Sequence, residues 1–145
     1  MGTLRRLDHV AVLVRDTAEA LEYFSNELGL TVVCSDEVPV PPVRLTYLDA
    51  GNAYLQLVEP LESDSWLTKQ IEGQGEGLHH ICFGVDDVEA AVDVLSGGNG
   101  ADATIGSGRG RKSAFVPGEL MHGVRVECTE FRHEEDVTQS PGFLS

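Results

Sequence analysis

The segment LHHICFGV (78–85) repeats the pattern of LDHVAVLV (7–14), and this repeat decides the fold. His9 in the first segment corresponds to His80 in the second, 71 residues later. Gln56 in YLQLVEP corresponds to Glu127 in VRVECTE at the same offset. Each half therefore carries a His and, 47 residues later, a side chain with an oxygen donor. A repeat of this length indicates a duplicated module rather than a solenoid array.

Each half also carries the signals of a helix directly after its first segment. DTAE (16–19) opens a helical pattern that ends at Gly29, and DDVE (86–89) opens another that ends at Gly97. An Asp followed three residues later by Glu can satisfy the free amides at a helix start, and Gly favours the conformation that ends a helix. Each half is thus predicted to begin with a strand and a helix.

Alternation along the strands predicts which side chains share a face. Val10, Val12 and Val14 project to one side and can pack against the first helix, which leaves His9 on the opposite, concave side. Gln56 is likewise expected opposite the apolar side chains of its strand. The further strands are predicted over 31–38, 43–49 and 53–59 in the first half and over 101–105, 111–117 and 123–130 in the second.

The repeat predicts one domain over residues 1–131, built from modules 7–60 and 78–131. The linker 61–77 is expected to hold a short helix capped by Ser63. The tail 132–145 is polar without periodicity and is expected to fray or to contact a partner subunit.

Composition excludes several classes of function. A net charge of -14 over 145 residues disfavours nucleic acid and anionic membranes as partners. No segment approaches the roughly 20 apolar residues that span a bilayer, so a soluble, cytoplasmic protein is expected. The three cysteines lie in apolar, strand-like contexts and are expected to be reduced, buried thiols.

The order strand, helix, three strands, found twice with His, Gln, His and Glu at these places, resembles the vicinal oxygen chelate superfamily. The stretch EPLESDSWLTKQIEGQGEGLHHICFGVDDVEAAV is similar to methylmalonyl-CoA epimerases, and GEGLHHI followed by VDD is its most specific part. The resemblance covers about residues 7–130. It implies an α+β fold of two tandem βαβββ modules that form a curled mixed sheet around a metal site.

By position in these motifs the metal ligands would be His9, Gln56, His80 and Glu127, with His79 as a neighbour that points the other way. Two imidazoles, an amide oxygen and a carboxylate suit one borderline divalent ion such as Co, Ni, Zn or Mn, and leave positions open for chelating oxygens. Such an ion is a Lewis acid that can stabilise an enolate formed beside a carbonyl group.

One departure from the family bears on the mechanism. The epimerases carry an acidic residue in a stretch resembling EVPEQGVR, where it acts as a second base across the substrate from the metal-bound glutamate. This chain reads EVPVPPVR, which places Val40 there. Glu127 can still serve as a single base. Asp36 or Glu37 could reach in as a substitute; the alternative interpretation is that both are solvated carboxylates at a strand end.

Three cations stand together in the otherwise acidic chain. The stretch GSGRGRKSAF contains Arg109, Arg111 and Lys112 among glycines that let a ligand approach the backbone. They could hold the phosphates of a coenzyme A, since Arg offers a bidentate fork and Lys a point charge. A solvated hairpin is the alternative.

These observations predict a metal-dependent, epimerase-like enzyme that moves a proton next to a thioester carbonyl, with methylmalonyl-CoA as the nearest substrate model. It is expected to act on a small molecule, possibly a CoA thioester, and to be a homodimer. A glyoxalase I-type lyase or another enolate isomerase remains an alternative, because one base suffices there. A binding protein that sequesters a small molecule is the contrasting class, but such relatives commonly lack the metal ligands.

Overall fold

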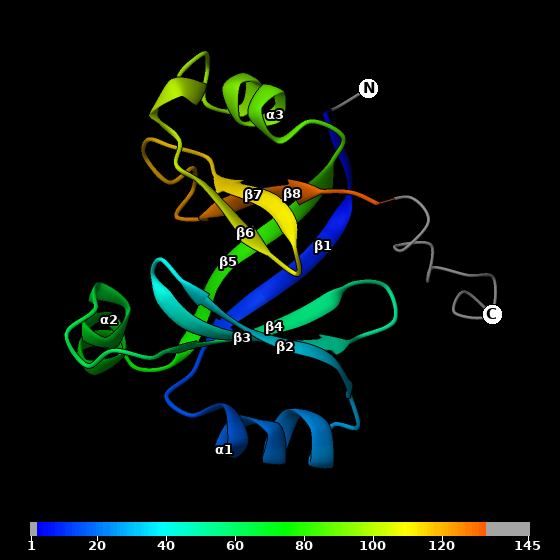
Figure 1. Cartoon of the computed structure of the whole chain (residues 1–145), viewed down its shortest axis with the longest axis vertical. Coiled ribbons are helices and arrows are strands. Elements are labelled where there is room, and N and C mark those ends of the chain that lie inside the picture. Colours follow the sequence, from blue (N-terminus) through cyan, green and yellow to red (C-terminus); the bar gives the residue numbers. More distant parts are fainter. Residues whose placement is uncertain (1–2, 133–145) are drawn as a thin grey trace. The chain divides into compact units, whose positions relative to one another are not determined.

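The computed structural model describes residues 3–132 of the chain (Figure 1). A strand, a helix and three strands follow one another twice, with one more helix between the two sets. This order confirms the predicted α+β fold. The elements are β1 (Leu4–Leu13), α1 (Thr17–Leu21), η1 (Glu22–Glu27), β2 (Thr31–Pro39), β3 (Pro42–Asp49), β4 (Tyr54–Pro60), α2 (Trp66–Gln74), β5 (Gly77–Val85), α3 (Val88–Leu95), η2 (Gly100–Asp102), β6 (Ile105–Gly108), β7 (Arg111–Phe115) and β8 (Val126–Glu130).

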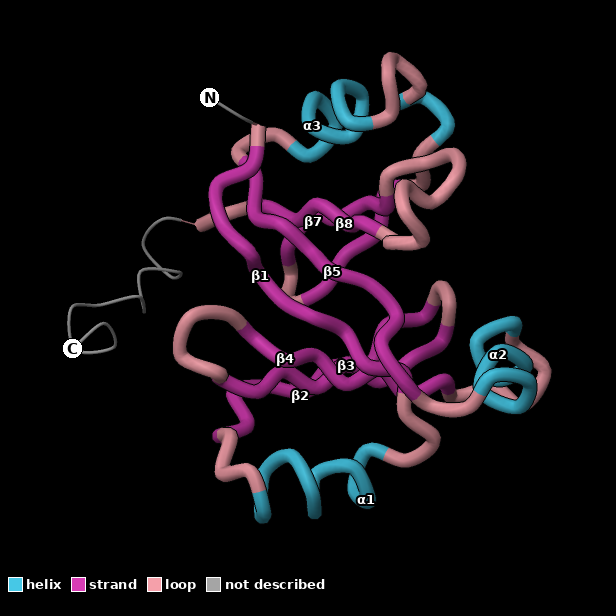
Figure 2. The backbone as a smooth tube through the Cα atoms, turned by 180° about the vertical axis from the view of Figure 1, so that it is seen from behind, coloured by secondary structure: helices cyan, strands magenta, loops and turns pink. Residues whose placement is uncertain are grey.

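The strands form a mixed sheet in the order β2-β3-β4-β1-β5-β8-β7-β6 (Figure 2). Within each module the last three strands pair as an antiparallel meander. β5 and β8 pair in parallel, with Cys82 opposite Glu127. This register places the metal-ligand candidate of β8 beside the strand that carries His80.

The described chain forms two compact units whose boundaries differ from those of the repeat. One unit contains the residues up to His9, Gly51–Ala53 and the residues from His80 onward. The other contains Val10–Ala50 and Tyr54–His79. β1 therefore changes unit between His9 and Val10, and His9 belongs with the second half of the chain.

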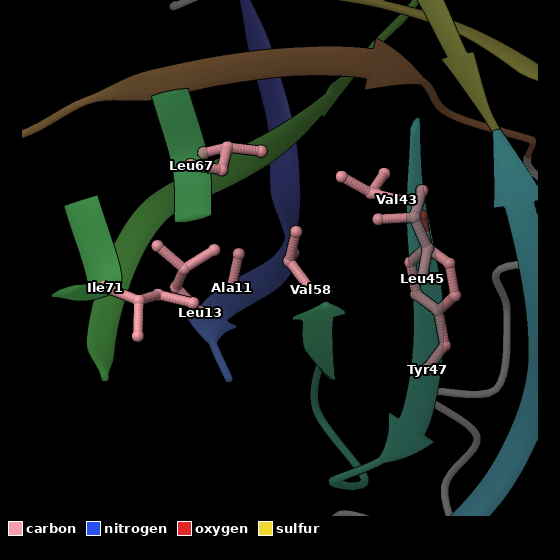
Figure 3. Close-up of a cluster of buried hydrophobic side chains, with 8 residues drawn as sticks. All are labelled: Ala11, Leu13, Val43, Leu45, Tyr47, Val58, Leu67 and Ile71. Carbon is pink, nitrogen blue, oxygen red and sulfur yellow. The ribbon is translucent and has the colours of Figure 1, made fainter. Parts of the chain in front are cut away.

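The unit of residues 10–50 and 54–79 buries apolar side chains on both faces of its strands. On one face, Val12 of β1 and Val14, which directly follows it, pack with Leu57 of β4 against Phe24 of η1, as alternation predicted. On the other face, Leu67 and Ile71 of α2 cover β1, β3 and β4 (Figure 3). The members of this second cluster are Ala11, Leu13, Val43, Leu45, Tyr47, Val58, Leu67 and Ile71.

The other unit has a smaller core beneath α3. Val88, Ala91 and Val92 follow the spacing of one helix face and are buried against Val85 and Cys128 of the central strands. This packing fixes β5 and β8 side by side, and these two strands carry His80 and Glu127.

The helix boundaries correct several expectations. Asp16 caps α1 by accepting a hydrogen bond from the Glu19 amide at 2.9 Å, but the helix continues as the π-helical segment η1 rather than as a regular α-helix to Gly29. Ser65, not Ser63, caps α2 through the Thr68 amide. These shifts stay within one or two residues because several polar side chains near each start compete for the same amides.

Asp87, not Asp86, caps α3 by accepting a hydrogen bond from the Ala90 amide at 3.0 Å. Asp86 instead pairs with Arg5. The strand predicted at 101–105 lies at 105–108, because residues 100–102 form a 3₁₀ turn. The tail 133–145 lies outside the described residues, so its expected fraying or partner contact stays a prediction.

Candidate metal centre

Three donor side chains meet inside one unit, from three different strands. His9 comes from β1, His80 from β5 and Glu127 from β8. The Nε2 atom of His9 lies 3.3 Å from Nε2 of His80 and 3.3 Å from Oε1 of Glu127. The Nε2 atom of His80 lies 3.1 Å from the same carboxylate oxygen. Strand pairing has thus brought together donors that the sequence separates by 71 and 47 positions.

These spacings fit a single divalent ion. Two ligands that each lie about 2.1 Å from a metal are about 3.0 Å apart at a right angle and about 3.4 Å apart at a tetrahedral angle. The three observed separations fall within that interval. Both histidines present Nε2 toward the shared point, and both are buried. The donor set and its spacing therefore suit a borderline divalent metal.

The electrostatics of the three groups favour a positive charge between them. Burial tends to raise the pKa of Glu127, but its hydrogen bonds with His80 and His9 outweigh burial and hold the pKa far below its usual range. Burial lowers the pKa of His80, and the opposing effect of Glu127 only partly offsets this decrease. For His9, the hydrogen bonds with Asp8 and Glu127 outweigh burial and raise the pKa. Glu127 is thus a carboxylate whose charge needs either a proton on a neighbouring imidazole or a metal ion.

Asp8 orients His9 from behind. Its Oδ2 atom lies 2.7 Å from Nδ1 of His9 and also accepts a hydrogen bond from the guanidinium of Arg109. Because Nδ1 donates to this carboxylate, neutral His9 keeps the lone pair of Nε2 directed at His80 and Glu127. We did not predict Asp8 from the sequence, although it directly precedes His9 in LDHV.

Gln56 belongs to the other compact unit and is buried there. Its Nε2 atom donates to the hydroxyl of Tyr47 at 2.8 Å. Its Oε1 atom is buried and accepts no hydrogen bond from residues 3–132. Leaving a buried carbonyl oxygen unpaired is unfavourable, so this oxygen is available to a cation or a ligand. Tyr47, which fixes the amide, is a second residue that the sequence did not indicate.

His79 points away from the three donors. Its ring lies 6.0 Å, between centroids, from the ring of Trp66 at the start of α2. His79 and Trp66 belong to one unit and His80 belongs to the other. Neighbouring strand residues face opposite sides of a sheet, which explains the separation.

The thiols near the site are protected. Cys82 and Cys128 are fully buried, as expected, and Cys34 is partly exposed. Burial and the nearby carboxylate of Glu127 raise the pKa of Cys82 well above its usual value and that of Cys128 to about 11. Both buried groups therefore remain thiols at neutral pH.

The candidate second base lies on the β2–β3 hairpin. Glu37 is exposed on β2 and pairs with Arg44 of β3 at 2.7 Å. Val40 stands in the turn of this hairpin with 84% of its surface exposed. The hairpin therefore presents an apolar side chain at the position where the resemblance to the epimerases led us to expect an acid.

The three cations of the β6–β7 hairpin have different surroundings. The side chain of Arg109 is 9% exposed and contacts Asp8. Arg111 is buried and donates to the carbonyl of Glu130 at 3.4 Å. Lys112 is exposed and pairs with Glu89 of α3 at 2.9 Å. The structure therefore does not gather the three side chains into one exposed cluster.

Comparison with known proteins places this chain in a family. Residues 8–115 match the family model of the Glyoxalase/Bleomycin resistance protein/Dioxygenase superfamily. The protein YqjC of Bacillus subtilis is 32% identical over 130 residues, which cover 88% of this chain and 93% of YqjC. The ethylmalonyl-CoA/methylmalonyl-CoA epimerase of Cereibacter sphaeroides is 32% identical and is covered to 97% of its length.

The mouse mitochondrial methylmalonyl-CoA epimerase is 39% identical over 92 residues, but this chain spans only about half of it (51%). Among solved structures, a variant of the Streptomyces coelicolor methylmalonyl-CoA epimerase in complex with 2-nitronate-propionyl-CoA superposes with a TM-score of 0.75 and 30% identity. That match covers 95% of this chain and 99% of the epimerase. No helix within residues 3–132 combines the length and hydropathy needed to cross a membrane. Family model, relatives and fold agree that the chain belongs to the glyoxalase/bleomycin resistance protein/dioxygenase superfamily, with methylmalonyl-CoA epimerases among its homologues.

Proposed function

We propose that this protein is a metal-dependent, epimerase-like enzyme that moves the proton next to a thioester carbonyl, with a short acyl-CoA such as methylmalonyl-CoA as substrate. The observation that carries the proposal is the carboxylate of Glu127, which lies 3.1–3.3 Å from two buried imidazoles in a chain related to CoA-thioester epimerases. We also propose a homodimer, in keeping with the expectation from sequence.

We propose that His9, His80 and Glu127 hold the metal ion. Gln56, the fourth ligand predicted from the sequence, belongs to the other compact unit and stays a prediction. The ion would supply a Lewis acid that polarises the carbonyl oxygen of the substrate. Glu127 is the base that accepts the α-proton and returns it. His9 and His80 keep this carboxylate charged and oriented.

A two-base epimerisation also needs a second base, because a proton acceptor on one face of the carbon requires a proton donor on the other face. Glu37 is our candidate for that role, although Arg44 holds its carboxylate. Val40 favours a one-base alternative, a glyoxalase I-type lyase or another enolate isomerase. A probable lactoylglutathione lyase of Synechocystis, 24% identical, is among the relatives.

Deuterium incorporation tests the proposed reaction. The purified protein, loaded with Co²⁺ or Zn²⁺, is incubated in D₂O either with methylmalonyl-CoA or with the hemithioacetal of glutathione and methylglyoxal. Metal-dependent exchange at the α-carbon of the thioester supports the proposal. Turnover of the hemithioacetal alone would replace it with the lyase, and tight binding of either compound without exchange would indicate a sequestering protein.

Introducing an acid at position 40 should raise stereoisomer interconversion. Val40→Glu is expected to increase the rate of methylmalonyl-CoA epimerisation by about 10²-fold, the usual contribution of a positioned general base. The substitution should fold normally, because Val40 is exposed in a turn. The rate is measured by circular dichroism of the two stereoisomers.

Val33→Glu is the matched control, since it adds the same charge to an exposed site on the same hairpin. An increase in both variants would indicate a general charge effect. Rapid epimerisation by the unmodified protein would show that Val40 is no handicap and would direct attention to Glu37.

Of the predicted phosphate contacts Arg109, Arg111 and Lys112, we propose Lys112 as the side chain that meets a coenzyme phosphate. Lys112 is the member whose charged group is exposed. The other two side chains are largely buried against protein groups. A phosphate contact through Lys112 would have to compete with Glu89.

A further inference from the structure

Among the Arg–carboxylate and Lys–carboxylate pairs of residues 3–132, the Arg109–Asp8 pair is the one with both side chains largely buried. Asp8 is fully buried. A carboxylate in this environment is strongly unfavourable unless it is paired and hydrogen-bonded. Its Oδ2 atom faces both Nδ1 of His9 and the guanidinium of Arg109. Arg109 thus supplies the charge that lets Asp8 remain an anion beside His9.

The backbone conformation at Arg109 is one that Arg does not favour, so the turn itself gives no reason for an Arg at this position. Arg109 and Gly110 form the two-residue turn between β6 and β7, with Gly108 paired to Arg111. Arg109 has φ of 55°. Asn, Asp and Gly favour this left-handed conformation in such turns, whereas Arg does not. The hydrogen bond from the Arg109 guanidinium to Asp8, 101 residues earlier in the sequence, offsets the backbone strain.

The contact between Asp8 and His9 determines which imidazole nitrogen faces the metal position. The Oδ2 atom of Asp8 accepts a hydrogen bond from Nδ1–H of His9, and this directs the Nε2 lone pair at the metal position. Carboxylates that hold metal-binding histidines in this way commonly raise metal affinity by about 10–100-fold.

We infer that Arg109 and Asp8 are positioning residues of the metal centre: Arg109 holds Asp8, and Asp8 holds His9 in the tautomer and orientation that bind a divalent ion. The inference rests on the proposed metal site but not on the proposed reaction. It assigns the guanidinium of Arg109 to the protein interior rather than to a coenzyme phosphate.

Titration with Co²⁺ measures the effect without any substrate. The visible absorption of bound Co²⁺ gives both the affinity and the ligand geometry of the full-length protein. Arg109→Gln and Asp8→Asn are each expected to weaken Co²⁺ binding by about 10–100-fold and to shift the absorption bands. The Co²⁺ affinity of the double variant should be close to that of the single variant with the lower affinity, because both substitutions interrupt the same chain of contacts.

Arg5→Gln is the matched control. It removes an Arg–Asp pair from the same strand, three residues before Asp8, but this pair is exposed. Its Co²⁺ affinity should stay within about twofold of the wild type, as expected for a surface substitution. Arg109→Lys keeps the positive charge without the fork and should bind with intermediate affinity. The Arg109→Lys variant replaces Arg109→Gln in the test if far-UV circular dichroism shows that Arg109→Gln does not fold.

Each outcome has a distinct meaning. Wild-type affinity in folded Arg109→Gln, or in Arg109→Lys where the Gln variant does not fold, would overturn the positioning role. Additive losses in the double variant would do the same, because the two residues would then act separately. Failure of the wild type itself to bind Co²⁺ would overturn the proposed metal site on which the inference rests.

Discussion

Glu127→Gln is expected to lower the rate of α-proton exchange in methylmalonyl-CoA by about 10²–10⁴-fold, the contribution of a positioned general base. Gln keeps an oxygen donor at the point where Nε2 of His9 and Nε2 of His80 converge, so the variant should retain much of its metal. It loses the carboxylate that accepts the proton. Exchange is followed by mass spectrometry in D₂O, with metal content measured on the same sample.

Glu130→Gln provides the matched control, because Glu130 lies three residues later on β8 and its carboxylate accepts a hydrogen bond from the Lys112 amide. Its exchange rate should stay close to that of the wild type. Unchanged exchange in a metal-loaded Glu127→Gln variant would remove Glu127 from the role of base, while leaving its role as a ligand intact.

His80→Ala and His79→Ala should differ sharply in metal binding although they alter adjacent residues. His80 supplies one of three converging donor atoms, so its loss should weaken divalent-ion binding by more than the roughly 10–100-fold typical of residues that only support a ligand. His79 packs near Trp66 instead, and its replacement should cost about 1 kcal/mol of stability with little effect on metal affinity. Isothermal titration with Zn²⁺ compares the two.

The same pair of variants can contradict the ligand assignment. Equal metal affinity in both would show that His80 is not a ligand. A larger loss in His79→Ala would mean that the strand presents the opposite face to the metal.

The sequence predicted most of the fold because its local signals agree with each other. Alternating valines in β1, an Asp cap at Asp16 and the matching pattern after His80 all describe one module twice. Where two polar residues compete, as Asp86 and Asp87 do at the start of α3, the pattern cannot choose. The tertiary contact between Asp86 and Arg5 decides it. The π-helical segment after α1 has no such signal in the sequence.

The convergence of His9, His80 and Glu127 followed from the repeat, since a common offset predicts equivalent positions in equivalent strands. Asp8 could not be found in this way. Strand alternation places neighbours on opposite faces, so it gave no reason to join Asp8 to His9. The contact of Asp8 with Arg109 crosses 101 residues and depends on one strained turn, which no local pattern indicates.

The placement of the three donors on β1, β5 and β8 has a consequence for the energetics of the whole unit. An ion held by these residues would tie together points of the chain that are 71 and 47 residues apart, and so would restrict the unfolded chain as a cross-link does. Its binding energy would then count as folding energy, by about 2.7 kcal/mol when the free ion is at a hundred times its dissociation constant. A low concentration of free metal would therefore lower the stability of the folded protein as well as its activity.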